Sequence, residues 1–346
     1  MKKLFYLLLM LCLLVSCEHR ELLETLDKHY IRVYFDEDIQ NVSHGFYDDS
    51  REKPENSSPD MLRVALCDTE SGDMLFEEYL SAKGSDEHGN YIEGVIKAPP
   101  GIYHLMAYNF DTESTHVRDM YNYYKMQGYT NPISSRLQSY LVTTRDENNS
   151  QKVVYEPDHL FLLTEENLVI EHTATVDTLR PKNDTFFKAK TTVETYYFQV
   201  GVKGVHFVSS AVAILTGMAG SVQMHDATLP MDPVSLFFNL QAGAANKLSA
   251  TSVAYASFHT FGRLEMVDSE MTITFEFYTI DGRVQVEKFS LTDIFKTAQV
   301  QENGWIILDY IVEIDPPEIT DDDGGGISPD VGEWTEIESE IEIKHK

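Results

Sequence analysis

The chain has 346 residues and a formal net charge of −29 at pH 7, with 56 acidic and 27 basic side chains. So acidic a chain repels nucleic-acid phosphates, because binding to DNA or RNA depends on Lys and Arg side chains that neutralise them. The length is large for one domain and suits two. DNA and RNA are therefore excluded as partners.

The N-terminal segment carries a targeting signal. Lys2 and Lys3 precede an uninterrupted apolar run at residues 4–15, which is shorter than the roughly 20 residues that span a bilayer. A basic start, a short apolar region and small residues are typical of a secretory signal. The stretch LVSC at residues 14–17 also resembles a bacterial lipobox, a signal in which the peptide is cut before the cysteine and the cysteine carries lipid.

The lipobox predicts a lipoprotein signal peptide at residues 1–16 and a lipidated tether at residues 17–28 that starts with Cys17. Two acyl chains on that cysteine would give stable attachment to a membrane without a spanning segment. No later stretch of the chain approaches 18 consecutive apolar residues. A plain signal peptide with a cysteine near its cleavage site is the alternative.

The remaining cysteines do not indicate disulfides. Cys12 lies in the signal segment and Cys17 is assigned to lipid, so Cys67 has no partner. An exported protein of this size without disulfides must be stabilised by its hydrophobic cores. Cys67 is interpreted as a small buried side chain at the end of a strand, and a nucleophilic cysteine is the alternative.

Apolar and polar residues alternate along the stretch 29–172, and this pattern predicts half-buried strands. The alternation is found at residues 31–35, 62–66 and 103–107. Pro99-Pro100-Gly101 predicts a turn before the last of these. The apolar residues between 117 and 124 have helical spacing, which predicts a short helix there.

The stretch 173–316 repeats this pattern. Alternation predicts strands at 196–202, 234–240, 271–277 and 306–314, and Asp281-Gly282 predicts a hairpin turn after the third of these. The polar segment 173–190 carries Pro181 and is the best boundary candidate. Strands joined by short turns, with little helix, predict an all-β chain of two tandem antiparallel β-sandwich domains, at 29–172 and 173–316.

The last thirty residues form a separate acidic tail at 317–346. It holds ten acidic residues, two lysines and a flexible stretch at Asp321–Gly326. Apolar side chains of one parity suggest a terminal strand that docks on a sheet edge, in this chain or on a partner. The candidate docking side chains are Trp334, Ile337, Ile341 and Ile343. A disordered acidic tail is the alternative.

Catalytic and metal-binding patterns are scarce. The twelve histidines are scattered without an HExxH motif, and no phosphate-binding loop occurs. The acidic stretch at 321–324 does not fit the spacing of an EF-hand. The sequence therefore indicates no enzyme, no small-molecule substrate and no cofactor, although weak calcium binding by loop carboxylates stays open.

Several stretches, taken in order, resemble a known group of proteins. After the lipobox they are HYIRVYFDED, APPGIYHLMAYNFD, EPDHLFLL, LTGMAGSVQM, ASFHTFGRLEM and TIDGRVQVEKFSLTD. Together they resemble the fimbrillin-like and fimbrial-anchor lipoproteins of Bacteroides-type bacteria, and most closely an uncharacterised lipoprotein family of that group. The likeness covers nearly the whole chain after Cys17.

This resemblance implies two transthyretin-like sandwiches, a lipid anchor in the outer membrane, exposure at the cell surface, and no catalytic residues. It also implies a role in fimbria (pilus) anchoring, assembly or adhesion, with fimbrial subunits or other surface proteins bound through β-strand contacts. A surface glycan-binding lipoprotein of a nutrient-uptake system is the alternative function. A hydrolase built on loop carboxylates is a third hypothesis.

Overall fold

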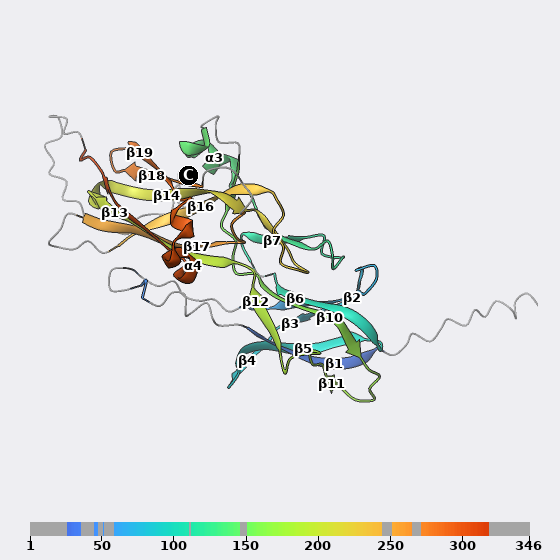
Figure 1. The fold of residues 1–346 in the computed structure, drawn as a ribbon. Helices are drawn as coiled ribbons and strands as arrows, with labels where there is room; N and C mark the ends of the chain where they lie inside the picture. The colour runs from blue at the N-terminus through green and yellow to red at the C-terminus, as the bar shows by residue number, and fades with distance from the viewer. Residues whose placement is uncertain are drawn as a thin grey trace, which may run out of the picture.

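The computed structural model describes residues 26–35, 45–47, 51, 59–110, 112–145, 151–243, 251–264 and 271–317. Within these ranges the chain is almost entirely β and forms two sheet-rich domains, as the alternating pattern predicts (Figure 1). The transthyretin-like arrangement implied by the resemblance stays a prediction.

The first domain is one sheet that bends around a core, in the strand order β3-β2-β6-β10-β12-β1-β5-β4, with β11 beside β1. Its strands are β1 (Asp27–Phe35), β2 (Leu62–Asp68), β3 (Met74–Leu80), β4 (Ala82–Asp86), β5 (Gly89–Ala98), β6 (Gly101–Asn109), β10 (Phe161–Ile170), β11 (Asp177–Thr178) and β12 (Phe187–Thr191).

Alternation along these strands decides which side chains form the first core. On β1, Ile31, Val33 and Phe35 point inward, and they meet buried side chains of β2, β5, β6 and β10. The side chains between them, Arg32 and Tyr34, lie on the outer face, because successive residues of a strand point to opposite faces.

The second domain has the strand order β19-β18-β14-β16-β17-β13-β20, with β9 beside β16. Its strands are β9 (Lys152–Tyr155), β13 (Glu194–Lys203), β14 (Val208–Ala219), β16 (Pro233–Ala242), β17 (Thr251–Thr260), β18 (Thr272–Thr279), β19 (Val284–Ser290) and β20 (Trp305–Glu313). The short helices are α3 (Ser135–Tyr140), α4 (Ala298–Asn303), η1 (Thr143–Arg145), η2 (Val205–Phe207) and η3 (Ile294–Lys296).

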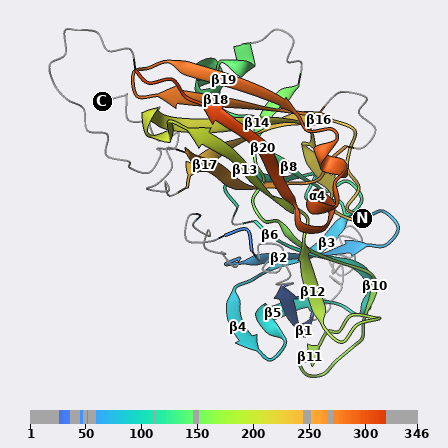
Figure 2. The same cartoon turned by 60° about the vertical axis from the view of Figure 1, so that its left-hand side comes forward.

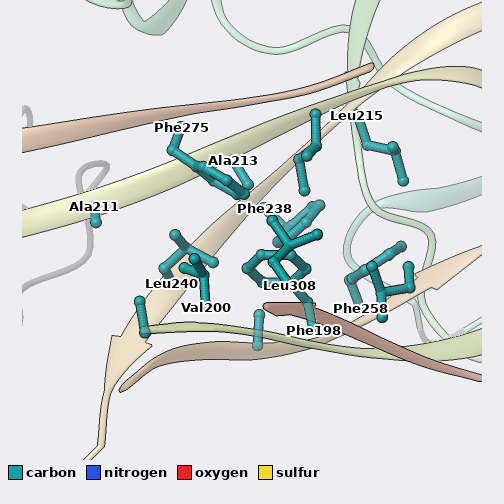
Figure 3. Close-up of a cluster of buried hydrophobic side chains, with 14 of the residues drawn as sticks. Phe198, Val200, Ala211, Ala213, Leu215, Phe238, Leu240, Phe258, Phe275 and Leu308 are labelled. Atoms are coloured by element: carbon teal, nitrogen blue, oxygen red, sulfur yellow. The ribbon is translucent and has the colours of Figure 1, made fainter. Parts of the chain in front are cut away.

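The second core lies between the two layers of this domain (Figure 3). Phe198 of β13, Phe258 of β17 and Leu308 of β20 meet Phe238 of β16 and Phe275 of β18. The rings of Phe238 and Phe258 stack with centroids 4.3 Å apart. This aromatic stack ties the two layers together, because β16 and β17 are also the strands through which one layer continues into the other.

A third, smaller sheet joins the domains. It consists of β7 (Thr115–Arg118), β8 (Gln127–Thr130) and β15 (Ser221–Gln223), in the order β15-β8-β7. Because β15 follows β14 of the second domain, its pairing with β8 links chain segments about a hundred residues apart. Met224, next to β15, packs in one cluster with Met106 and Leu162 of the first domain.

The structure differs from two expectations about chain organisation. The segment 173–190, expected to divide the domains at 172/173, supplies β11 and β12 to the first domain, whereas β9 pairs with β16 of the second. The sheets are also not purely antiparallel, because β1–β12, β16–β9 and β13–β20 are parallel pairs. Local alternation identifies strands, but it does not reveal which distant strands pair.

The short helix predicted over 117–124 is wrong. Residues 115–118 form β7, and turns follow at 119–125. Val117 and Met120, two of the residues with helical spacing, pack instead against the hydrophobic cluster between the domains. Tyr123 is buried in that cluster. Tertiary packing therefore outweighs the local pattern here.

Two histidines meet where the chain passes between the domains. The rings of His159, just before β10, and His259 of β17 lie 4.1 Å apart. His259 Nδ1 is 3.0 Å from the hydroxyl of Thr195, and its backbone N–H donates to the Glu156 carboxylate. Desolvation lowers the pKa of both imidazoles, to about 3 for His259, so both rings are neutral at pH 7.

The aromatic stack of the second core gives a stability prediction. Phe238→Ala should reduce the free energy of unfolding by about 3–5 kcal/mol, because it removes a buried ring and leaves a cavity. Urea unfolding of the variant and the wild type measures the difference. The control is Val286→Ala on the exposed face of β19, which should change stability by less than about 0.5 kcal/mol. Equal losses in the two variants would contradict the assigned core.

The histidine contact gives a pH prediction. Between about pH 3 and pH 6.5 the unfolded chain holds more protons on His259 than the folded chain does. The free energy of unfolding should therefore fall as pH falls from 7 to 5, a window that lies above the ordinary pKa values of Asp and Glu.

His259→Gln should flatten this fall by about 2 kcal/mol in urea unfolding at pH 5 and pH 7. Val286→Ala, which changes an exposed side chain of β19 that does not titrate, is the control and should leave the pH dependence unchanged. Identical pH dependence in the wild type and His259→Gln would show that the imidazole is not held neutral.

Candidate functional site

No arrangement in the described part of the chain suggests catalysis. Within the described ranges, no group of three or more His, Cys, Asp or Glu side chains is placed to hold a metal ion. Cys67 is buried in β2, and burial raises the pKa of its thiol to about 11. A protonated, inaccessible thiol is a poor nucleophile, so Cys67 acts as the small core residue expected from the sequence.

The site residues predicted from the sequence lie elsewhere. Cys17, Trp334, Ile337, Ile341 and Ile343 are outside the described residues, as are the tail carboxylates considered for calcium. No helix in the described residues is both long and apolar enough to cross a membrane. The candidate site must therefore be sought among surfaces on which a partner could pair.

The second domain leaves two sheet edges for such pairing. Within the described ranges, β19 pairs only with β18, and β20 pairs only with β13. In Figure 2, β20, coloured red, crosses the second domain below β18 and β19. The outer edge of each strand presents backbone N–H and C=O groups to which an added strand can bond.

A bulge shapes the β20 edge. The register between β13 and β20 shifts from the pair Val200–Leu308 to the pair Gly201–Ile311. A Cβ atom at Gly201 would lie 3.0 Å from the backbone oxygen of Tyr310, so glycine permits the close approach of the bulged strand. The sequence shows this glycine, but only the pairing of β13 with β20 explains it.

Both edges carry exposed apolar side chains. On β20, Ile307, Tyr310 and Ile311 have exposed fractions of 36%, 47% and 51%. On β19, Val284 and Val286 are exposed to a similar degree. Exposed apolar side chains beside backbone groups without a strand partner form an edge on which another strand can add.

The two edges also face each other at one end of the domain. Gln285 of β19 donates a hydrogen bond to the backbone oxygen of Glu313 of β20, at 3.0 Å. Arg283 donates to the backbone oxygens of Asp315 and Pro316, at 3.0 and 3.1 Å. These contacts fix the direction in which the chain leaves β20, so the acidic tail starts beside both edges.

Comparison with known proteins gives one named relative. The chain is 24% identical over 299 residues to the Bacteroides ovatus protein named "Putative fimbrium anchoring subunit Fim4B". The alignment covers 80% of this chain and 82% of that protein. The likeness therefore spans both domains rather than a single motif.

A solved structure with a similar fold is known. The crystal structure of a "putative adhesin" from Bacteroides ovatus superposes with a TM-score of 0.51 at 20% identity, covering 84% of this chain and 94% of that one. The fimbrial anchor protein Mfa2 from Porphyromonas gingivalis gives a TM-score of 0.41 at 12% identity, covering 81% and 88% of the two chains.

A family model settles the membership of the chain. The model described as "Domain of unknown function (DUF5119)" matches residues 16–239. This match includes the whole first domain, the linking sheet and the second domain as far as β16. With well over half of the residues matched, the chain belongs to the DUF5119 family.

Proposed function

We propose that this protein is a non-enzymatic lipoprotein of the cell surface that acts in fimbrial anchoring or adhesion. The observation that carries the proposal is the similarity to a named fimbrium anchoring subunit across four-fifths of the chain. The adhesin-like fold and the two open, apolar edges of the second domain support the same function.

Attachment to the outer membrane is assigned to Cys17. The family match starts at residue 16, so the apolar run at 4–15 lies outside the family domain and suits a signal that is removed. A lipidated cysteine directly before the domain would hold the protein at the membrane and leave both sandwiches free to meet partners. The first domain, whose strand β1 begins at Asp27, is then the membrane-proximal one.

Contact with a fimbrial subunit is assigned to strand addition at the second domain. The edges β19 and β20 offer backbone groups and apolar side chains, and the tail that starts beside them carries Trp334 and the isoleucines at 337, 341 and 343. We assign this tail to the partner's sheet, so that the tail and the open edges form one docking surface.

Replacing the lipidated residue tests the anchor. Cys17→Ala should remove the acylation site, and the protein should move from the membrane fraction to the soluble fraction when cells are lysed and fractionated. Cys67→Ala is the matched control, because that thiol is buried in the first domain, and it should stay in the membrane fraction. Membrane retention of Cys17→Ala would contradict lipid attachment at this residue.

Deleting residues 333–343 tests the docking tail. The deletion should abolish recovery of fimbrial subunits with the protein from cell-envelope extracts, because it removes the strand that the partner receives. The free energy of unfolding in urea should not change, because the tail belongs to the partner's sheet.

A second variant tests the β20 edge without touching the tail. Ile311→Lys adds a charge where an incoming strand would pack, and it should reduce recovery of the subunits. Val169→Lys is the control, since Val169 is equally exposed on β10 of the first domain. Full recovery of subunits by both the tail deletion and Ile311→Lys would contradict strand addition at this surface.

A further inference from the structure

A ladder of tyrosine and charged side chains lies on the outer face of β1 and β5 in the first domain. Tyr30, Arg32 and Tyr34 alternate with the core residues of β1, so all three lie on the face away from the core. On the neighbouring strand β5, Tyr91 stands opposite Tyr34, and Glu93 stands opposite Arg32. The face therefore carries aromatic rings and charges at fixed positions.

Hydrogen bonds hold this ladder rigid. The Arg32 guanidinium donates from Nε to Glu93, at 2.7 Å, and from Nη1 to Asp86, at 3.0 Å, and it lies 3.8 Å from the centre of the Tyr91 ring. Tyr30 donates to Glu93, and Tyr34 donates to Asp86. Each hydroxyl and each edge of the guanidinium is thus held before any ligand arrives, which lowers the entropy cost of binding.

The segment between β11 and β12, residues 179–186, forms a wall beside this ladder. Leu179 N–H donates to the Tyr30 carbonyl at 2.8 Å, and Lys182 N–H donates to the Glu165 carboxylate at 3.0 Å. These two hydrogen bonds hold the wall against β1 and β10. Between wall and ladder lies a cavity of about 260 Å³. Its lining consists of Tyr30, Arg32, Tyr34, Thr178, Leu179, Arg180, Pro181, Thr185, Phe186 and Phe187.

Aromatic rings form one side of the cavity. The Phe186 ring packs against Tyr34 and His88, with centroids 5.2 and 4.4 Å away. Tyr34 is only 2% exposed, whereas Phe186 keeps part of its ring accessible. A partly accessible aromatic ring beside hydroxyl groups suits a ligand with one apolar face and a polar rim.

The chemistry of the lining narrows the ligand class. Two arginines among the lining residues disfavour a cation. Arg32 offers an anion no free edge, because Glu93 and Asp86 already accept its hydrogen bonds. Arg180 is the second lining arginine, and the charge of −29 on the whole chain opposes the approach of an anion to it. The cavity volume is slightly smaller than the roughly 300 Å³ at which pockets for drug-sized ligands begin, so the cavity suits a small ligand.

We propose that this cavity binds a neutral sugar, one pyranose unit of a surface glycan. The apolar C–H face of the ring stacks on Phe186, and the sugar hydroxyls bond to Tyr30, Thr178 and Thr185. The site lies in the first domain, far in the fold from the edges β19 and β20, so it is independent of fimbrial contact. It also gives a structural basis for the glycan-binding alternative considered from the sequence.

Binding of defined sugars to the full-length protein tests this proposal. The probes are the methyl glycosides of glucose, galactose, mannose and N-acetylglucosamine, titrated by calorimetry and by saturation-transfer NMR. At least one should bind saturably in the millimolar range, and Phe186→Ala should weaken its binding about tenfold through loss of the stacked ring.

Two control variants separate the site from its surroundings. Tyr121→Ala removes an aromatic side chain that is 65% exposed in the turn between β7 and β8, and it should leave binding unchanged. Lys97→Gln removes a positive charge from an exposed position of β5 outside the cavity lining and should also leave binding unchanged. Urea unfolding of Phe186→Ala checks that any loss of binding is not loss of the folded domain.

Three outcomes would overturn the proposal. The first is the absence of saturable binding by all four glycosides at millimolar concentration. The second is wild-type binding by folded Phe186→Ala. The third is that methyl glucuronide binds more than tenfold tighter than the neutral sugars and loses this advantage in Arg180→Gln, which would identify an anion site.

Discussion

Backbone pairing of β12 with two strands at once closes the first domain. This short strand bonds to β10 on one side, antiparallel, and to β1 on the other, parallel. Without it the layer β3-β2-β6-β10 and the layer β1-β5-β4 would be separate sheets, each exposing the apolar face that now forms the first core. The connection that leads into β12 builds the wall of the outer cavity, and the chain that leaves it starts the second domain.

The first domain offers an outer face for contacts, and the second domain offers strand edges. A sandwich buries the inner faces of its strands, so only outer faces and edges remain for contacts. In the first domain the outer face of β1 and β5 is polar, aromatic and cross-bonded, which suits a small ligand. In the second domain the edges β19 and β20 are apolar and unpaired within the described residues, which suits an extended polypeptide. The proposed glycan contact and the proposed fimbrial contact therefore use separate surfaces.

Strands could be predicted from the sequence because their burial alternates, and the expected strands around Val33, Val64, Leu236 and Phe275 are all present. Which strands pair with one another could not be predicted in this way. The pairing of β12 with β1 and of β9 with β16 joins residues more than eighty positions apart, and no local pattern records it. The outer cavity was missed for this reason, since Arg32 and Phe186 become neighbours only when β12 joins β1. The sequence YIRVY did contain a signal for this site, because its polar side chains Tyr30, Arg32 and Tyr34 share one face of the strand.

The parallel pairing of β20 with β13 also bears on mechanical load. Tension along the chain would enter the fold at Asp27, where β1 begins, and leave it at Glu313, where β20 ends. Both strands would be pulled along their own axes while their neighbours hold them side by side, so the hydrogen bonds of each ladder would share the force rather than open one after another. β1 bonds to β5 over eight consecutive residue pairs and to β12 and β11 on its other side. Such an arrangement resists a steady pull, which is what the proposed role in fimbrial anchoring requires.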